Sequence, residues 1–178
     1  MILSRDELVK EFGSTFEHSS WIAEAAFDAG AFQGVSRAAD GVIRLNAEEV
    51  NRIHMAMCEA FRAAPREKRL EVLRAHPDLA GRLAVARELS RDSENEQRGA
   101  GLDRLTPDEH DRFLHLNLNY QARFGFPFIV AVKGLDKRTI LQSFQKRVHS
   151  EPEAEFERAC AEVERIARFR LEARMDDA

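Results

Sequence analysis

The chain of 178 residues is poor in cysteine: Cys58 and Cys160, about a hundred positions apart, are the two that it contains. Neither belongs to a metal-binding motif, so a zinc finger and a disulfide framework are excluded. Each lies in an amphipathic stretch, which predicts two reduced thiols in the protein core. Long apolar runs are also lacking, since none approaches the roughly 18 residues that a membrane-spanning helix needs.

Positive charge is not in excess. Lysine and arginine together number 27 against 31 aspartates and glutamates, for a formal net charge of −4. The chain therefore lacks the basic surface typical of proteins that bind nucleic acids or acidic membranes. Arg5, Asp6 and Glu7 occupy the place where a secretory signal would have its apolar centre, and no peroxisomal Ser-Lys-Leu tail ends the sequence. We predict a cytoplasmic protein with no membrane or nucleic-acid partner.

Signals for helix starts recur along almost the whole chain. Ser4 with Glu7, and Asn46 with Glu49, match the capping box, in which the side chains at the two ends of the first turn bind each other's backbone. The run 106–109, Thr-Pro-Asp-Glu, is the clearest start because it combines a capping residue, proline at the first helical position and an acidic third residue. Apolar residues then recur at spacings of three and four, the period of an amphipathic helix.

Residues 128–132 form the one strand-like stretch, a short apolar run between Pro127 and Gly134. One such run cannot build a sheet alone, so we predict a buried extended connection. The composition, with 44% hydrophobic and 33% charged residues, is that of a globular chain, and no internal repeat interrupts it. The sequence predicts an all-α fold: a single domain over residues 1–178, built as a bundle of about seven to nine helices.

Arg170 stands out because it continues an apolar stripe formed by Phe156, Cys160, Val163 and Ala167. An arginine cannot lose its proton and is seldom buried without an anionic partner. Arg170 either forms a structural ion pair with a glutamate, emerges at a frayed helix end, or presents its planar fork to a carboxylate or ureido group of a ligand.

His76 directly precedes Pro77, and proline disfavours helical geometry in the residue before it. We therefore expect His76 at a break between two helices, either as a turn residue or as a side chain aimed into a cleft. Imidazole titrates near neutral pH, which suits proton transfer. A metal site is not expected, because no second histidine or cysteine lies at ligand spacing on the same element.

The run 93–97, Ser-Glu-Asn-Glu-Gln, has two interpretations that are compatible with each other. Ser93 with Glu96 matches a capping box and predicts a helix that starts at Ser93. The free N–H groups of a helix start also suit an electron-rich ligand, beside which Glu96 and Gln97 would supply an acceptor and an amide.

Several blocks follow one another along the chain: Phe16-Glu17-His18-Ser19 with Trp21, His76-Pro77-Asp78-Leu79-Ala80, Ser93-x-x-Glu96-Gln97, Ala100-Gly101-Leu102, Leu116-Asn117 through Tyr120, Phe124-Gly125-Phe126-Pro127-Phe128-Ile129 and Arg170-Leu171. Taken together and in this order, they resemble the OHCU decarboxylase family, named for 2-oxo-4-hydroxy-4-carboxy-5-ureidoimidazoline, and the resemblance covers nearly the whole chain. Two departures, Ser20 in place of the family's usual proline and His149-Ser150 in place of its usual asparagine region, lie outside the blocks that carry chemistry.

The resemblance implies an all-helical homodimer that works without metal or organic cofactor. It implies a carboxy-lyase whose small-molecule substrate is OHCU and whose product is (S)-allantoin, in the breakdown of urate. By motif position, His76 would be the catalytic proton donor, and Glu96 would hold its protonation state. The substrate-binding residues would be Pro77, Ser93, Glu94, Asn95, Glu96, Gln97, Phe128, Ile129, Val130, Ala131, Val132 and Arg170, of which 128–132 would contribute mainly backbone groups.

Two other classes of protein stay open on the residues alone. A helical adaptor without catalysis would need neither a histidine at a helix break nor an inward-facing arginine. A metal-dependent hydrolase would need a cluster of ligands, which the sequence does not display.

Overall fold

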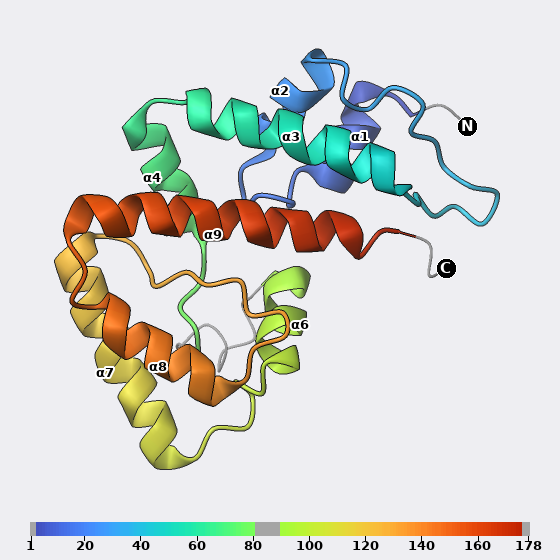
Figure 1. The fold of residues 1–178 in the computed structure, drawn as a ribbon. Helices are drawn as coiled ribbons and strands as arrows, with labels where there is room; N and C mark the ends of the chain where they lie inside the picture. The colour runs from blue at the N-terminus through green and yellow to red at the C-terminus, as the bar shows by residue number, and fades with distance from the viewer. Residues whose placement is uncertain (1–2, 81–89, 176–178) are drawn as a thin grey trace. The chain divides into compact units, whose positions relative to one another are not determined.

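The computed structural model describes residues 3–80 and 90–175, in which helices are joined by turns and irregular connections and almost no strand occurs (Figure 1). The all-α prediction is confirmed. Within the described residues no helix is long and apolar enough to cross a membrane. The described residues form eight helices: α1 (Arg5–Phe12), α2 (Ser20–Asp28), α3 (Ala47–Ala63), α4 (Arg66–Ala75), α6 (Arg91–Gly99), α7 (Pro107–Phe124), α8 (Lys137–Arg147) and α9 (Pro152–Glu172).

Local capping sets where most of these helices begin. The predicted boxes form at Ser4 before α1, at Asn46 before α3 and at Thr106 before α7, each with both reciprocal hydrogen bonds. At the other end of α7, Gly125 adopts a left-handed conformation with φ of 77°, which glycine reaches without strain. Gly13, the C-cap of α1, leaves no room for a side chain, because a Cβ there would lie 2.5 Å from the carbonyl oxygen of Val9.

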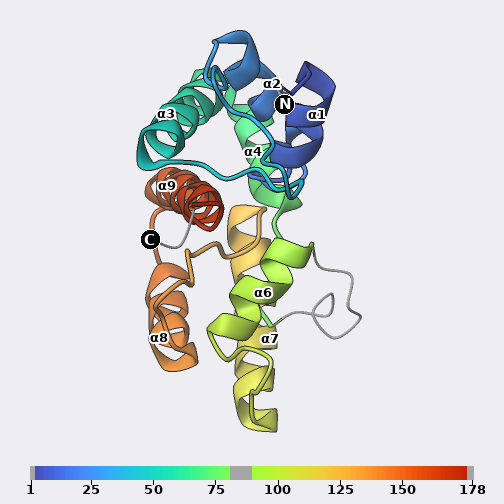
Figure 2. The ribbon, with the colours of Figure 1, turned by 90° about the vertical axis from the view of Figure 1, so that its right-hand side faces the viewer.

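The chain divides into two compact units, so the single-domain prediction remains a prediction. The first unit comprises the chain up to Ala75 together with the part from Glu164 onward. In it α1, α2 and α3 pack together (Figure 2). Its core holds the ring pairs Phe12–Phe32 and Phe16–Phe61, with centroids 5.0 and 5.4 Å apart.

The second unit, His76–Val163, has its own core around Tyr120 of α7. The Tyr120 ring packs edge-on against Phe126, Phe128 and Phe144. Phe128 and Phe144 stack face to face with centroids 3.9 Å apart. The core therefore joins α7, α8 and the segment between them.

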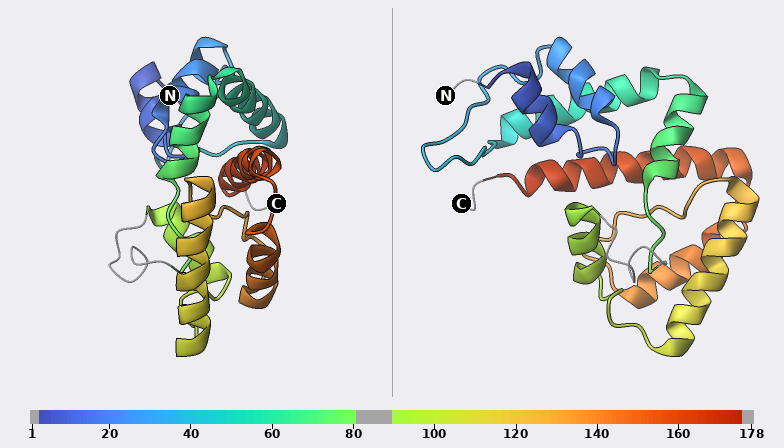
Figure 3. Two further views of the ribbon diagram at one scale, coloured as in Figure 1. Left: turned by 90° about the vertical axis from the view of Figure 1, so that its left-hand side faces the viewer. Right: turned by 180° about the vertical axis from the view of Figure 1, so that it is seen from behind.

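That segment, residues 127–132, is the extended connection that the sequence predicts. It runs from the end of α7 toward α8 without forming a strand (Figure 3). Its residues 128–132 are all buried. The described residues contain two isolated β-bridges, Arg37 with Ile43 and Leu45 with Met175, and neither involves this segment.

Candidate active site

His76 lies where the sequence predicts, immediately after the last residue of α4. Its side chain is buried, with 7% of its surface exposed. Pro77 follows it and lacks the backbone N–H that a continued helix would use, so the chain turns at this point. The histidine is thus placed at a helix end inside the protein, as expected for a side chain that acts in an enclosed site.

The backbone that follows His76 is held by two side-chain amides through three hydrogen bonds. Gln97 of α6 accepts a hydrogen bond from the Ala80 N–H at 3.0 Å and donates to the Asp78 carbonyl at 3.3 Å. Asn117 of α7 donates to the Leu79 carbonyl at 2.9 Å. Side chains of α6 and α7 thus satisfy the Asp78 and Leu79 carbonyls and the Ala80 N–H, which fixes the path of the chain beyond His76.

Two further features mark this segment as constrained. Ala80 has a φ of 52°, in the left-handed region that L-residues seldom adopt. The Asp78 carboxyl accepts a hydrogen bond from Gln121 of α7. Burial raises the pKa of Asp78, and the Gln121 hydrogen bond opposes part of that rise.

The start of α6 corrects one prediction. The helix is capped by Ser90, whose hydroxyl accepts from the Ser93 N–H at 3.2 Å, so Ser93 lies inside the first turn and is not the cap. Ser93 with Glu96 fits the capping pattern better than Ser90 does, because no acidic residue lies three positions after Ser90. The hydroxyl of Ser90 nevertheless reaches the backbone, and the helix begins three residues earlier than the pattern predicted.

Because residues 93–97 are helical, they do not all face one way. Ser93 and Gln97, four positions apart, are buried on the inner face of α6, and Glu96 is half-buried beside them. Glu94 and Asn95 are exposed, and Glu94 forms an ion pair with Arg98 at 2.6 Å. The predicted substrate-binding run therefore splits between an inner and an outer face.

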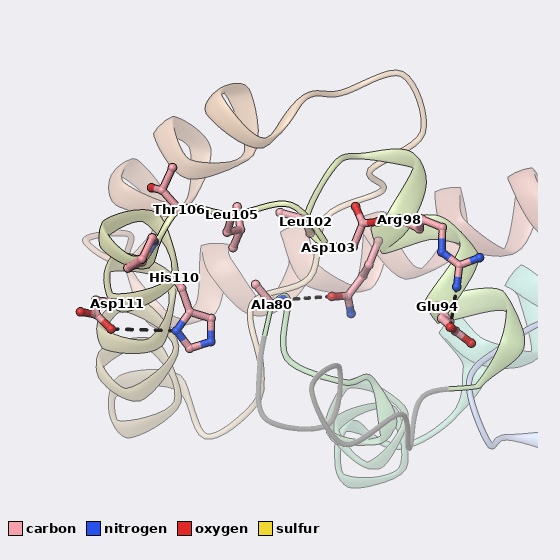
Figure 4. A pocket seen from close by; sticks show the side chains of 11 residues that line it. Ala80, Glu94, Arg98, Leu102, Asp103, Leu105, Thr106, His110 and Asp111 are labelled. Carbon is pink, nitrogen blue, oxygen red and sulfur yellow. Dashed lines mark hydrogen bonds and ion pairs between the residues drawn. The ribbon is translucent and has the colours of Figure 1, made fainter.

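A pocket of about 540 Å³ opens beside this helix (Figure 4). It contains two of the predicted site residues, Glu94 and Gln97, while His76 and residues 128–132 do not line it. Its far wall comes from the start of α7, where His110 lies 3.9 Å from Asp111. The other lining residues are Ala80, Arg98, Leu102, Asp103, Leu105, Thr106 and Pro107.

The backbone of residues 128–132 has side-chain partners in place of a neighbouring strand. The Ile129 carbonyl accepts a hydrogen bond from Arg147 of α8 at 2.8 Å. The Ala131 N–H donates to Glu162 of α9 at 2.8 Å. Arg147 is itself paired with Glu155 at 2.7 Å, and both side chains are almost fully buried.

Arg170 forms an ion pair with Glu17 at 2.8 Å, with 6% and 2% of the two side chains exposed. It also donates to the Ser14 carbonyl at 3.0 Å. Of the alternatives that the sequence left open, the structural ion pair is therefore present. Arg170 and Glu17 both belong to the first unit, and the role of Arg170 in binding substrate remains a prediction.

Several residues that bind the predicted site residues within each unit could not be identified from the sequence. Glu17, Asn117 and the Arg147–Glu155 pair make their contacts to residues distant in sequence. The available signal was weak: Glu17 and Asn117 fall within stretches that resemble the family, but nothing in those stretches indicates their partners.

Both cysteines are buried and unlinked, as predicted. Cys58 lies 3.3 Å from His54, yet burial raises the pKa of the Cys58 thiol to about 12, so this pair does not supply a thiolate at neutral pH. Among residues 3–80 and 90–175, no group of three or more histidine, cysteine, aspartate and glutamate side chains is arranged to hold a metal ion.

Several known proteins are similar in sequence to this chain. The chain is 42% identical over 164 residues to the uric acid degradation bifunctional protein PucL of Bacillus subtilis, a match that covers 92% of this chain and 29% of that protein. It is 38% identical over 172 residues to a 2-oxo-4-hydroxy-4-carboxy-5-ureidoimidazoline decarboxylase of Haloferax volcanii, covering 97% of this chain and 91% of the relative.

Solved structures agree with these sequence matches. The crystal structure of an (S)-allantoin synthase superimposes with a TM-score of 0.71 at 30% identity, over 98% of this chain and 52% of that one. An OHCU decarboxylase crystallised in the presence of (S)-allantoin shares the fold, with a TM-score of 0.68 at 18% identity. The sequence profile of the OHCU decarboxylase family matches residues 2–172, and the chain belongs to that family.

Proposed function

We propose that this protein decarboxylates 2-oxo-4-hydroxy-4-carboxy-5-ureidoimidazoline and releases (S)-allantoin. The observation that carries the proposal is His76, buried at the end of α4 in a segment that side chains of α6 and α7 hold in place. Membership of the OHCU decarboxylase family supplies the reaction that such a histidine would serve.

The substrate supplies its own electron sink. The bond between the ring carbon and the carboxylate breaks, carbon dioxide leaves, and the electron pair moves toward the adjacent carbon–nitrogen double bond, where the nitrogen accepts it. The product is an enol-like intermediate, which becomes allantoin when its hydroxyl loses a proton and the neighbouring ring carbon gains one. The nitrogen that accepts the electron pair takes up one proton for each carbon dioxide released. The protein therefore needs to orient the carboxylate and to deliver the carbon-bound proton to one face of the ring.

His76 is the proposed proton donor, because an imidazole exchanges protons near neutral pH and the burial of this side chain limits competing transfer from water. Ser93, Glu96 and Gln97 are proposed to bind the polar ring from the inner face of α6. Glu94 and Asn95, which are exposed, remain part of the proposed substrate-binding set.

Arg170 is proposed to bind the substrate carboxylate or ureido group, as its motif position implies. A guanidinium carries five N–H donors, so the contact with Glu17 does not by itself occupy all of the donors of Arg170. Residues 128–132 are proposed to offer backbone groups, and Pro77 a rigid contact beside His76.

A homodimer and a cytoplasmic location are also proposed. Light scattering on the purified protein measures the first, and a mass corresponding to one chain of 20.3 kDa would refute it. Fractionation of the source cells measures the second.

The test of the proposed function is stereochemical. The substrate also decays unaided, and that background yields racemic allantoin, so the enantiomeric excess of the product separates catalysis from decay. We expect the wild-type protein to give (S)-allantoin in excess. A racemic product formed at the uncatalysed rate by well-folded protein would favour the adaptor alternative.

His76→Asn provides the matched variant. It should keep the wild-type melting temperature and lose roughly 10²–10⁴-fold in rate, the usual contribution of a positioned acid–base group. Wild-type turnover with an unchanged enantiomeric excess would show that His76 is a turn residue only.

A further inference from the structure

Residues 128–132 pose a hydrogen-bonding problem that their sequence does not solve. An extended, buried chain must satisfy its backbone N–H and C=O groups, and a sheet would do so through a neighbouring strand. Among the described residues no strand pairs with this segment. Its partners are side chains of α8 and α9, which bind the Ile129 carbonyl and the Ala131 N–H at 2.8 Å each.

The positions of these two contacts matter. Along an extended chain, the N–H and C=O groups of one residue point to one edge, and those of the next residue point to the opposite edge. Ile129 and Ala131 are two positions apart, so the side chains of Arg147 and Glu162 occupy the same edge of the segment. The backbone groups of Phe128 and Val130 are therefore directed to the other edge.

The group that holds Ile129 is unusual for a protein interior. Arg147 and Glu155 have 3% and 0% of their side chains exposed and lie 2.7 Å apart. Tyr120 donates to the same Glu155 oxygen at 2.5 Å, and the Arg147 guanidinium lies 4.5 Å from the centroid of the Phe128 ring. Apolar residues of similar volume often stabilise a core as well as a buried ion pair does. A contribution to stability therefore does not explain why Arg147, Glu155 and Tyr120 occupy this part of the core. What apolar residues cannot do is bind the Ile129 carbonyl.

We propose that Arg147 and Glu162 are positioning residues for the reaction, with Glu155 and Tyr120 fixing Arg147. They hold one edge of residues 128–132 so that the backbone of Phe128 and Val130, on the other edge, keeps the geometry that the substrate requires. This inference rests on the proposed function, because it assigns the segment a substrate to position.

Conservative variants separate the geometric role from charge and size. Arg147→Lys keeps the positive charge but replaces a planar fork by a single ammonium group, which cannot bind Glu155 and the Ile129 carbonyl with the same geometry. Glu162→Met removes the acceptor for Ala131, whereas Glu162→Gln keeps an oxygen that can accept. Arg123→Lys is the matched control, because exposed Arg123 also donates to a backbone carbonyl, that of Ser150, at 3.0 Å.

We expect Arg147→Lys and Glu162→Met to lower kcat/KM roughly tenfold to a hundredfold with a raised KM, since small displacements of a substrate-binding group have effects of that size. Glu162→Gln and Arg123→Lys should stay near the wild type. A merely structural role would instead reduce the folded fraction and kcat in proportion and leave KM unchanged. Hydrogen exchange at the amides of residues 128–132 should rise in the two impaired variants.

The proposal is overturned if Arg147→Lys and Glu162→Met fold normally and match Arg123→Lys in KM and in exchange. If Arg147→Lys fails to fold, the Glu162 pair decides, because Glu162 is only half-buried. An inactive wild-type protein would refute the proposed function, while hydrogen exchange at residues 128–132 would still show whether Arg147 and Glu162 hold the segment.

Discussion

Arg170 and Glu17 are two opposite charges that the protein encloses almost completely. Desolvating either one alone would be costly, and their attraction offsets that cost only while both are present. The same arginine is the proposed substrate ligand, so its contributions to stability and to binding need to be measured separately.

Arg170→Met should lower the free energy of unfolding by about 3–5 kcal/mol, because it leaves the Glu17 carboxylate buried without its cation. The double variant Glu17→Leu/Arg170→Met should recover much of that loss. Urea unfolding measures both. If Arg170 also binds substrate, the double variant should be stable and inactive; full activity in it would limit Arg170 to its structural role.

The raised pKa of the Cys58 thiol predicts how the stability of the protein changes at alkaline pH. Its pKa in the folded protein is about 12, above the ordinary value of 9.0, so the unfolded chain releases this proton first. The free energy of unfolding should therefore fall as pH rises from about 9 toward 12. Tyr120 contributes in the same direction, because burial raises its pKa as well.

Melting temperatures measured across this range check the prediction. Cys58→Ala should start less stable and decline less steeply with pH, with Tyr120 accounting for part of what remains. A slope as steep as that of the wild-type protein would exclude Cys58 as a contributor.

Among the elements, α6 is where local pattern and structure disagree. Since Ser90 is the cap, Ser90→Ala should cost about 1 kcal/mol of stability, the usual value for loss of a capping hydroxyl. Ser93→Ala should leave the helix start intact and instead raise KM. Denaturant unfolding and KM, measured on both variants, distinguish the two serines; the reverse pattern would restore Ser93 as the cap.

Most helix starts could be predicted from sequence because their determinants are local; α6, which is also capped locally, is the exception. The capping boxes at Ser4 and Thr106 lie within four residues of the helices that they start, and short-range hydrogen bonds decide them. The break at His76 follows equally from its neighbour Pro77.

Contacts between distant residues could not be predicted in this way. The Arg170 stripe indicated a buried arginine, but which glutamate pairs with it depends on how the chain folds, and Glu17 is one of many candidates. Residues 128–132 likewise indicated a buried extended run, while Arg147 and Glu162 reach it from two helices that sequence spacing does not relate to it.

At the scale of the whole molecule, we expect activity to survive exhaustive chelation. The proposed substrate accepts its own electron pair, and the described residues contain no cluster suited to hold a metal ion. The measurement is turnover after dialysis against a strong chelator, with metal analysis of the same sample. Activity that is lost on chelation and restored by one divalent metal would contradict the prediction.

The left-handed backbone at Ala80 limits which sequences can serve this fold. The methyl side chain of alanine is strained in this conformation, and β-branched side chains are strained more. Glycine, asparagine and aspartate adopt it more readily. Ala80 therefore contributes to the fold through its backbone, yet we expect few other residues to be accepted at this position. Ala80 is also buried, which disfavours the polar asparagine and the charged aspartate. A library covering every amino acid at position 80, selected for growth on urate as nitrogen source, should therefore return mostly alanine and glycine.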